Sequence, residues 1–366
     1  MTPVRIAIFI SSLDGGGAER VMVTLANGFA QRGHRVDLVL VKAVGPFLKE
    51  VHSSVRVVDL KASRVLTSLP KLVGYLRRER PAVMLSALHH ANVVAIIARK
   101  VAGVPCRLLV SERSNYSMTL QNAKTAWQRL VMGMVRATYP KADGVIAVSN
   151  GVAEDLKRNI PLPADFVHVI YNPVVTEALL AAKDEIPDHP WLCNDDFQVI
   201  MSVGRLSPEK EYAQLIQSFA LIRAHRPVKL IILGEGDLRA DLELLVSKLG
   251  LEGEVDLPGF KGNPFSFLRM AKVFVLCSKW EGLPNALIQA MACGTPVVST
   301  DCPSGPGEIL ENGLWGRLVP VGDVDALAAA IVSTLDETNH PDVAARASAF
   351  NLDRSVEAYL DVLLKF

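Results

Sequence analysis

The residues 280–300 read WEGLPNALIQAMACGTPVVST, and this stretch decides the fold. An apolar run, VFVLC, precedes it at 273–277, and a second run, PVVS, lies within it at 296–299. Short continuous apolar runs are typical of strands buried on both faces of a parallel sheet. Residues 286–293 favour a helix, and Gly294 would end it. The pattern therefore predicts strand, loop, helix and strand, with the polar loop at the carboxyl end of a strand, where open α/β sheets bind ligands.

Two polar residues of this stretch stand eight positions apart, Glu281 in the loop and Gln289 about two helical turns later. With the following run ACGTPV at 292–297, the pattern resembles the retaining glycosyltransferases of family 4, which carry Glu-x7-Glu and have the GT-B fold. The resemblance implies that Glu281 contacts the donor sugar and that Gln289 meets the ribose. Because the family has Glu where this chain has Gln, we expect weaker or altered nucleotide binding. The implied donor site also includes Gly282, Leu283 and Pro284.

A second signal is GRLSPEK at 204–210, which follows an apolar run at 197–203. A glycine and two cations after a strand and before a helix suit a diphosphate without a metal ion. The family keeps Gly-Arg-x4-Lys here, and the resemblance implies that Gly204, Arg205 and Lys210 bind the donor diphosphate. These cations would also stabilise the negative charge that grows on the phosphate as the sugar leaves. We therefore predict no metal site and no cofactor, the nucleotide-sugar being a substrate.

The first strand is predicted at 6–10, and the loop DGGGAER follows at 14–20, before a helix at 21–31. Glycines in such a turn let backbone N–H groups approach an anion, and the helix N-terminus adds a favourable dipole. A tight turn without a ligand would have the same sequence. The family carries a similar loop, and the resemblance implies that it lies near the donor diphosphate and the acceptor. The residues concerned are Gly16 and Gly17 on the donor side and Glu19 and Arg20 on the acceptor side.

Two adjacent histidines, His89 and His90, follow the strand predicted at 83–88. A histidine at the carboxyl end of a strand suggests a place at the site, and a hydrogen-bonded structural histidine is the alternative. The next strand, at 108–110, ends in SERSN. Several relatives in family 4 have a histidine in that loop near the transferred sugar, whereas this chain has Arg113. Arg113 could bind an acceptor phosphate bidentately.

Two basic and apolar segments have two interpretations each. Residues 77–80, RRER, are either a solvated helix end or a contact with anionic phospholipid. Residues 127–139 alternate apolar side chains with Arg129 and Arg136. We interpret that segment as a core helix, and the alternative is a membrane-facing patch that would suit a lipid-linked acceptor.

The whole chain of 366 residues fits two domains better than one, and its formal net charge of +1 gives no argument for nucleic acid. Its five cysteines lack paired Cys-x2-Cys spacing, which favours reduced thiols over a zinc site. The apolar run at 6–10 is too short for a signal peptide, and no run approaches the length of a membrane span. We therefore expect a cytoplasmic protein, at most peripheral on the cytoplasmic face of the inner membrane.

Together these features predict an α/β protein with the GT-B fold, in which two Rossmann-like domains face each other across a cleft. The predicted first domain is 1–172 plus a C-terminal helix at 352–366 that crosses back to it, and the second is 173–351. The resemblance implies retaining transfer of a hexosyl or N-acetylhexosaminyl group from a nucleotide-diphosphate sugar, UDP-linked. The implied acceptor is a glycan, a polyprenyl-diphosphate-linked glycan or a lipopolysaccharide in cell-surface assembly. The alternatives are a soluble acceptor, and a degenerate GT-B binding subunit in which Gln289 marks lost catalysis.

Overall fold

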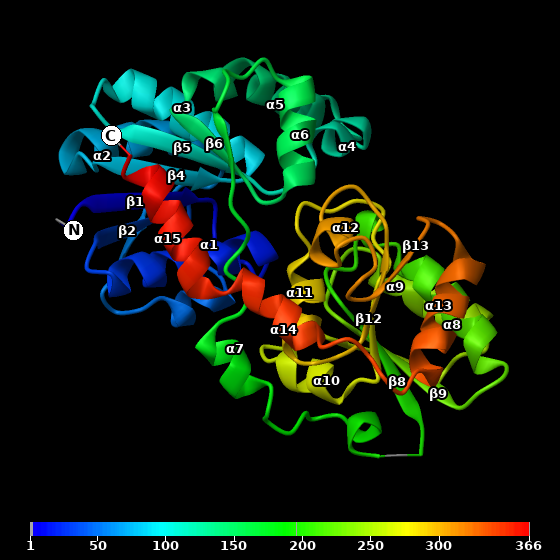
Figure 1. Cartoon of the computed structure of the whole chain (residues 1–366). Helices are drawn as coiled ribbons and strands as arrows, with labels where there is room; N and C mark the ends of the chain where they lie inside the picture. Colours follow the sequence, from blue (N-terminus) through cyan, green and yellow to red (C-terminus); the bar gives the residue numbers. More distant parts are fainter. Residues whose placement is uncertain (1–2, 195, 366) are drawn as a thin grey trace. The chain divides into compact units, whose positions relative to one another are not determined.

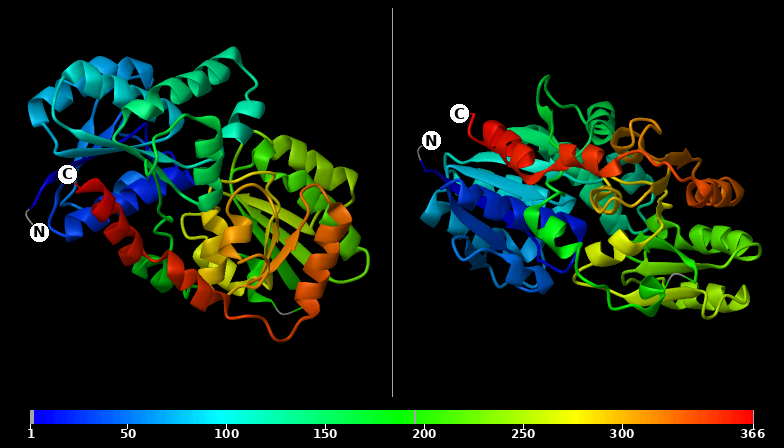
Figure 2. Two further views of the ribbon diagram at one scale, coloured as in Figure 1. Left: turned by 45° about the horizontal axis from the view of Figure 1, so that its top comes forward. Right: turned by 60° about the horizontal axis from the view of Figure 1, so that its bottom comes forward.

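The computed structural model describes residues 3–194 and 196–365, which form two compact units (Figure 1). The first unit is Met1–Pro173 with Leu352–Phe366, and the second is Val174–Asn351. Each unit is built on one parallel sheet, and Figure 2 shows helices on both faces of the sheets. The predicted α/β class with two Rossmann-like units is confirmed.

The sheet of the first unit has the strand order β3-β2-β1-β4-β5-β6-β7, and all its pairs are parallel. The strand order reverses between β1 and β4, so the loops that follow these strands lie where α/β sheets bind ligands. The strands are β1 (Arg5–Ile10), β2 (Arg35–Leu40), β3 (Arg56–Asp59), β4 (Val83–Ala87), β5 (Arg107–Glu112), β6 (Gly144–Ala147) and β7 (Val167–Val169). The helices are α1 (Gly17–Gln31), α2 (Leu69–Glu79), α3 (His89–Ala102), α4 (Tyr116–Gln121), α5 (Ala126–Thr138), α6 (Asn150–Asn159) and α15 (Leu352–Leu363).

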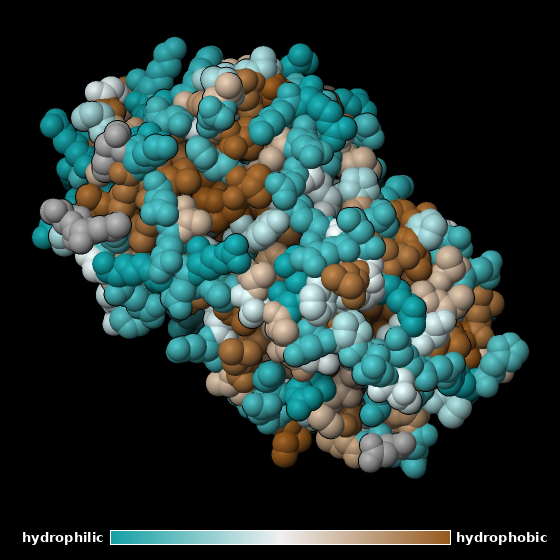
Figure 3. Space-filling model, viewed as in Figure 1, coloured by the Kyte–Doolittle hydropathy of each residue, from teal (hydrophilic) through white to brown (hydrophobic). Residues whose placement is uncertain are grey.

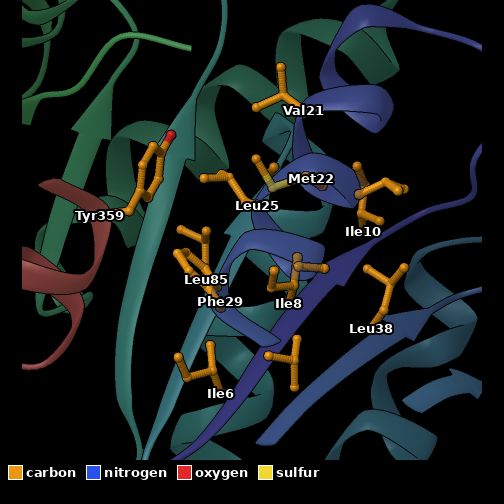
Figure 4. Packing of buried hydrophobic residues seen from close by; sticks show 14 of the residues in the cluster. Ile6, Ile8, Ile10, Val21, Met22, Leu25, Phe29, Leu38, Leu85 and Tyr359 are labelled. Atoms are coloured by element: carbon orange, nitrogen blue, oxygen red, sulfur yellow. The ribbon is translucent and has the colours of Figure 1, made fainter. Parts of the chain in front are cut away.

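The C-terminal helix α15 belongs to the first unit, where it packs against α1 (Figures 1 and 2). Gly28 on α1 permits this contact, since a Cβ there would come within 2.6 Å of Cγ2 of Val356. Tyr359 is fully buried with its ring centroid 6.5 Å from that of Phe29. Figure 4 shows Tyr359 beside the cluster that joins α1 to the isoleucines of β1. The last helix is therefore part of the first hydrophobic core.

The sheet of the second unit has the order β10-β9-β8-β11-β12-β13, again with parallel pairs. Residues 273–300 form β11, a loop, α11 and β12, as predicted, and the order reverses between β8 and β11. The strands are β8 (Gln198–Val203), β9 (Val228–Leu233), β10 (Val255–Gly259), β11 (Val273–Leu276), β12 (Val297–Thr300) and β13 (Arg317–Val319). The helices are α7 (Glu177–Ala182), α8 (Tyr212–Arg223), α9 (Arg239–Lys248), α10 (Phe265–Met270), α11 (Asn285–Ala292), α12 (Pro306–Ile309), α13 (Val324–Asp336) and α14 (Val343–Ala347).

Helix α5 is less buried than a core helix would be. Met132 and Val135 are buried, but Trp127 is 50% exposed and Leu130 is 54% exposed. Figure 3 shows apolar atoms at the surface of the first unit in the region of α3 and α5. The helix therefore has one apolar stripe in the core and a second facing solvent, and the interpretation of this segment as a core helix is wrong for the second stripe.

Two arginines at the basic end of α2 make contacts within the first unit. Arg77 donates hydrogen bonds to the carbonyl oxygens of Val101 and Ala102, and Arg78 forms an ion pair with Glu79. Because these contacts fix the guanidinium groups against the first unit, the structure favours the interpretation of a helix end over a phospholipid contact.

Glu79 lies in an ion-pair network that predicts acid sensitivity. Hydrogen bonds from Arg56 and then Arg78 lower the pKa of Glu79 from 4.5 to about 2. Since the folded-state pKa is lowered, this stabilisation is present above pH 4.5 and is lost as the pH falls toward 2. Arg56 is 47% exposed, so solvent screens the network, and we expect Glu79→Gln to lower the free energy of unfolding at pH 7 by about 1–2 kcal/mol.

Urea unfolding from pH 7 to pH 3 measures this difference, which should shrink as Glu79 protonates. Glu243→Gln is the matched control, because Glu243 pairs with Arg239 at 2.9 Å but is 54% exposed, and it should change stability little at any pH. A difference for Glu79→Gln that stays constant down to pH 3 would contradict the role of this carboxylate.

Candidate active site

The strongest candidate site in the second unit joins the loops that follow β8 and β11. Nζ of Lys210 lies 2.5 Å from Oε1 of Glu281, although 71 residues separate the two in sequence. Their side chains are only 20% and 12% exposed. Burial by itself would lower the pKa of Lys210, but the Glu281 carboxylate outweighs it and raises that pKa above its ordinary value. Lys210 is therefore a cation held in place at neutral pH.

The loop that carries Glu281 is fixed by hydrogen bonds on both sides. The backbone N–H of Glu281 donates to the carbonyl oxygen of Pro303 at 2.8 Å, and the N–H of Ser304 donates to the carbonyl oxygen of Glu281 at 3.1 Å. The fully buried Ser278 donates from Oγ to Oε1 of Glu281 at 2.7 Å. Thr300 in turn donates to the carbonyl oxygen of Ser278 at 2.6 Å. The carboxylate is thus pre-oriented by β11, β12 and their loops.

The other predicted donor residues of the second unit lie in the loops that follow β8 and β11 or on α11. Arg205 is exposed, and its guanidinium makes no hydrogen bond or ion pair to any residue that the structure describes. Gly204 precedes it, in a place too tight for a side chain: a Cβ there would lie 2.7 Å from the hydroxyl of Tyr212. Gln289 is half-buried on α11, and Gly282, Leu283 and Pro284 form the loop that leads into this helix. An exposed cation and a cation–carboxylate pair therefore stand at the carboxyl ends of β8 and β11.

In the first unit, the glycine loop leads directly into α1. Gly16 is the N-cap residue and Gly17 the first residue of the helix, so the loop lies at the carboxyl end of β1 as predicted. Glu19 lies in the first turn of the helix. The Arg20 guanidinium lies 4.6 Å from the ring centroid of Phe47, and the same side chain is 3.5 Å from the Glu50 carboxylate. Part of the charge of Arg20 is therefore used within the first unit.

The two adjacent histidines have different environments. His90 is exposed, whereas Nε2 of His89 lies 2.8 Å from Oε1 of Glu112, a carboxylate that is 2% exposed. Sequence reasoning did not single out Glu112, although an acid at the end of an apolar strand was a visible signal. Arg113 donates to Oγ of Ser111 at 3.2 Å and to Oδ1 of Asn172 at 2.6 Å, so its guanidinium is already engaged within the unit.

We searched the described part of the chain for clusters of side chains that could bind a metal ion. Among residues 3–194 and 196–365, no group of three or more histidine, cysteine or acidic side chains could hold a metal ion. An Asp-x-Asp sequence occurs at 323–325, but Asp323 is the N-cap of α13 and accepts a hydrogen bond from the N–H of Ala326 at 2.8 Å. Asp323 and Asp325 therefore have a structural role at the N-terminus of α13.

None of the helices in the described ranges is both long and apolar enough to cross a bilayer.

Two family models match most of the chain between them. Residues 15–178 match Glycosyltransferase Family 4, and residues 186–349 match Glycosyl transferases group 1. Among curated proteins, the chain is 31% identical to the N-acetylgalactosamine-N,N'-diacetylbacillosaminyl-diphospho-undecaprenol 4-alpha-N-acetylgalactosaminyltransferase of Campylobacter jejuni, over 91% of this chain and 90% of that protein. It is 28% identical to the lipopolysaccharide core biosynthesis glycosyltransferase LpsE of Rhizobium meliloti, over 95% of this chain and 96% of that protein.

Two solved structures are similar to the chain over nearly its whole length. Anabaena Alr3699/HepE, crystallised in complex with UDP and glucose, has a TM-score of 0.79 at 21% identity and covers 99% of this chain and 100% of its own. Sucrose-phosphate synthase from Thermosynechococcus elongatus has a TM-score of 0.82 at 21% identity, with 98% of each chain covered. At this level of identity the likeness is one of fold.

Proposed function

The chain belongs to glycosyltransferase family 4 and is a glycosyltransferase with the GT-B fold, and from this premise we propose that it transfers a sugar from a UDP-sugar to a polyprenyl-diphosphate-linked glycan. The observation that carries the proposal is the Lys210–Glu281 pair with the exposed Arg205 beside it. Two relatives named as acting on diphospho-undecaprenol-linked substrates support the choice of acceptor. A UDP complex of a structural neighbour supports the choice of base.

In the proposed mode of donor binding, the charged side chains of Arg205, Lys210 and Glu281 bind the nucleotide-sugar. Arg205 can turn to the diphosphate at little cost, because it has no partner among the described residues to give up. Lys210 is drawn from Glu281 to the phosphate as the donor binds, and Glu281 is then free to accept hydrogen bonds from the sugar hydroxyls. Once both cations contact the diphosphate, they stabilise the negative charge that develops on the leaving phosphate. This arrangement requires no metal ion or other cofactor.

The proposed reaction retains the anomeric configuration, with the leaving phosphate accepting the proton of the acceptor hydroxyl. The acceptor meets loops of the first unit, which carry His89 and Arg113 at the carboxyl ends of β4 and β5. Gln289 takes the place of the family's second glutamate and hydrogen-bonds the ribose through a neutral amide oxygen, which gives weaker donor binding than a carboxylate would.

Transfer assays with UDP-sugars in EDTA test this function. Radiolabelled UDP-glucose, UDP-galactose and their N-acetyl-amino counterparts would be offered with a polyprenyl-diphosphate-linked glycan, and the glycosidic linkage of the product would be assigned by NMR. Label in the lipid product with an α linkage is the expected result. Label in soluble sugars alone would favour the soluble-acceptor alternative, and absence of transfer with every donor would favour a binding subunit.

The proposed location is peripheral, on an anionic membrane in the cytoplasm, with α5 as the contact. The solvent-facing stripe of this helix carries Trp127 and Leu130, and Lys124, Arg129 and Arg136 are also exposed on or beside the helix. An aromatic and an aliphatic side chain beside cations suit the interface of an anionic bilayer.

Leu130→Glu tests this surface by removing apolar burial and adding a charge that anionic lipid repels. We expect partition onto vesicles of phosphatidylglycerol and phosphatidylethanolamine, measured by co-sedimentation, to fall about tenfold or more. The matched control is Leu244→Glu on α9, since Leu244 is also 54% exposed. Equal binding by both variants and the wild type would remove α5 from the membrane contact.

A further inference from the structure

The buried carboxylate of Glu112 stands at the end of β5, where several hydrogen-bond donors surround it. Its Oε2 accepts a hydrogen bond from the hydroxyl of Tyr139 at 2.8 Å, and its Oε1 accepts one from the N–H of Arg113 at 3.0 Å. His89 approaches the same Oε1 at 2.8 Å. An isolated carboxylate would be costly to bury, whereas one surrounded by donors is stabilised in its charged form.

The direction of these hydrogen bonds is fixed by Asn92, which is fully buried on α3. Its side-chain amide nitrogen donates to the hydroxyl of Tyr139 at 2.9 Å and to the carbonyl oxygen of Ser111 at 3.1 Å. The hydroxyl of Tyr139 therefore accepts from Asn92 and gives its single proton to Glu112. Because Tyr139 and the backbone N–H groups of Arg113 and Ser114 donate to Glu112, its carboxylate is held as a hydrogen-bond acceptor.

The sheet register brings His89 to this carboxylate. Ala87 of β4 pairs with Ser111 of β5, so the residues that follow these two strands are neighbours. Leu88 has φ 78° and ψ 135°, an unusual conformation for a residue with a side chain, and it turns the chain sharply into α3. His89 is the first residue of that helix. Strain in this position is expected where a structure fixes the direction of a functional side chain.

The imidazole of His89 is anchored on one side and open on the other. Its side chain is 15% exposed, and its Nδ1 has no hydrogen-bond partner among the described residues. Burial alone would lower the pKa of His89, but the Glu112 carboxylate outweighs it and raises that pKa above its ordinary value. The effects on Glu112 are opposite. Burial alone would raise the pKa of Glu112, but His89 outweighs burial and lowers that pKa below its ordinary value. Both shifts favour the charged form of each partner.

The other charged and titratable groups around the pair are Tyr116 of α4, whose pKa burial raises, and three residues from neighbouring segments. Tyr139 follows α5, and burial raises its pKa well above the ordinary value, so it stays a neutral donor. Arg113 follows β5 and directs its guanidinium to Ser111 and Asn172. His90 lies on the same helix as His89 and is exposed. Among the described residues, Glu112 is thus the carboxylate that lies in contact with His89.

We propose that Glu112 is a positioning residue that holds His89 as a fixed imidazolium, so that Nδ1–H of His89 donates a charged hydrogen bond to an oxygen of the acceptor. This inference rests on the proposed function for the identity of the acceptor. It assigns His89 the part of a donor and excludes it as the base that deprotonates the acceptor hydroxyl, since an imidazolium has no free lone pair. The proposal gives His90, which is exposed, no role in binding the acceptor.

NMR titration of the eight histidines tests the pairing without any assay of transfer. The ring Cε1–H signals of the wild type, Glu112→Gln and His89→Asn would be followed from pH 5 to pH 9, the last variant identifying the signal of His89. We expect His89 to titrate above 6.5 in the wild type and below 6.5 in Glu112→Gln, where burial acts alone. An unchanged titration of His89 in folded Glu112→Gln would overturn the proposal.

Kinetics with the lipid-linked acceptor then test the consequence. The wild type should lose kcat/KM for the acceptor as the pH rises through the titration of His89. Glu112→Gln should move this loss to lower pH and reduce kcat/KM at pH 8 by about 10–100-fold, with KM for the donor unchanged. A rise of activity on deprotonation of His89, or a change in donor KM alone, would overturn the role as donor. If no acceptor is used at all, the proposed function fails while the NMR result still decides the pairing.

Discussion

Replacement of Lys210 by methionine is expected to lower kcat for sugar transfer by about 10²–10³-fold, as loss of one preorganised charge at a developing anion does. The side chain keeps its length and loses the cation that faces the leaving phosphate. It also leaves Glu281, which is 12% exposed, without its partner at 2.5 Å. The measurement is single-turnover transfer at saturating donor, together with a thermal melt to confirm folding.

Lys229→Met is the matched control for this change. Lys229 is also in the second unit, its side chain is 17% exposed, and it forms an ion pair with Glu254 at 3.0 Å. Its loss removes a partly buried lysine–glutamate ion pair that is not among the candidate site residues, so kcat should stay close to the wild-type value. Glu281→Gln combined with Lys210→Met should cost far less than the two losses multiplied, because the residues act as a unit. Wild-type kcat in Lys210→Met would exclude Lys210 from the reaction.

Tyr359→Ala is expected to lower the free energy of unfolding of the first unit by about 3–5 kcal/mol, since it removes a fully buried aromatic ring. This ring joins α15 to α1 beside Gly28, so the loss should loosen the last helix as well as leave a cavity. Urea unfolding followed by circular dichroism measures the change, and hydrogen exchange in 352–363 would show whether α15 opens first.

Tyr359→Phe provides the control, because the hydroxyl of Tyr359 is buried without a hydrogen-bond partner among the described residues. Removal of an unsatisfied hydroxyl should leave stability unchanged or raise it by up to about 1 kcal/mol. A destabilisation of Tyr359→Phe equal to that of Tyr359→Ala would show that the ring does not carry the contact.

The sequence predicted those features that depend on local pattern. Apolar runs of strand length and the small-residue helix before Gly294 predicted β11, α11 and β12, and the structure confirms them. The pairing of Lys210 with Glu281 could not be predicted, because it depends on β8 and β11 becoming neighbours although two strands lie between them in sequence. The contact roles of these residues in donor binding stay predictions.

Two further features show why burial is hard to predict from a pattern. The apolar positions of 127–139 fit two stripes of one helix, and nothing local says that the stripe with Trp127 and Leu130 faces solvent. Glu112 follows an apolar run and could equally be a surface acid at a strand end. Its burial becomes understandable only with Tyr139 and His89, which come from separate elements.

Isothermal titration of UDP-sugars in EDTA, with the wild type and Arg205→Ala, tests the central claim most directly. Arg205 is exposed and has no partner to lose in the described structure, so its replacement should leave the fold intact. The account predicts binding without a metal ion and a Kd raised about 10–100-fold in Arg205→Ala, the loss of a charged hydrogen-bonding group. Equal affinity in the two proteins, or binding that appears only when Mg²⁺ or Mn²⁺ is added, would contradict the account.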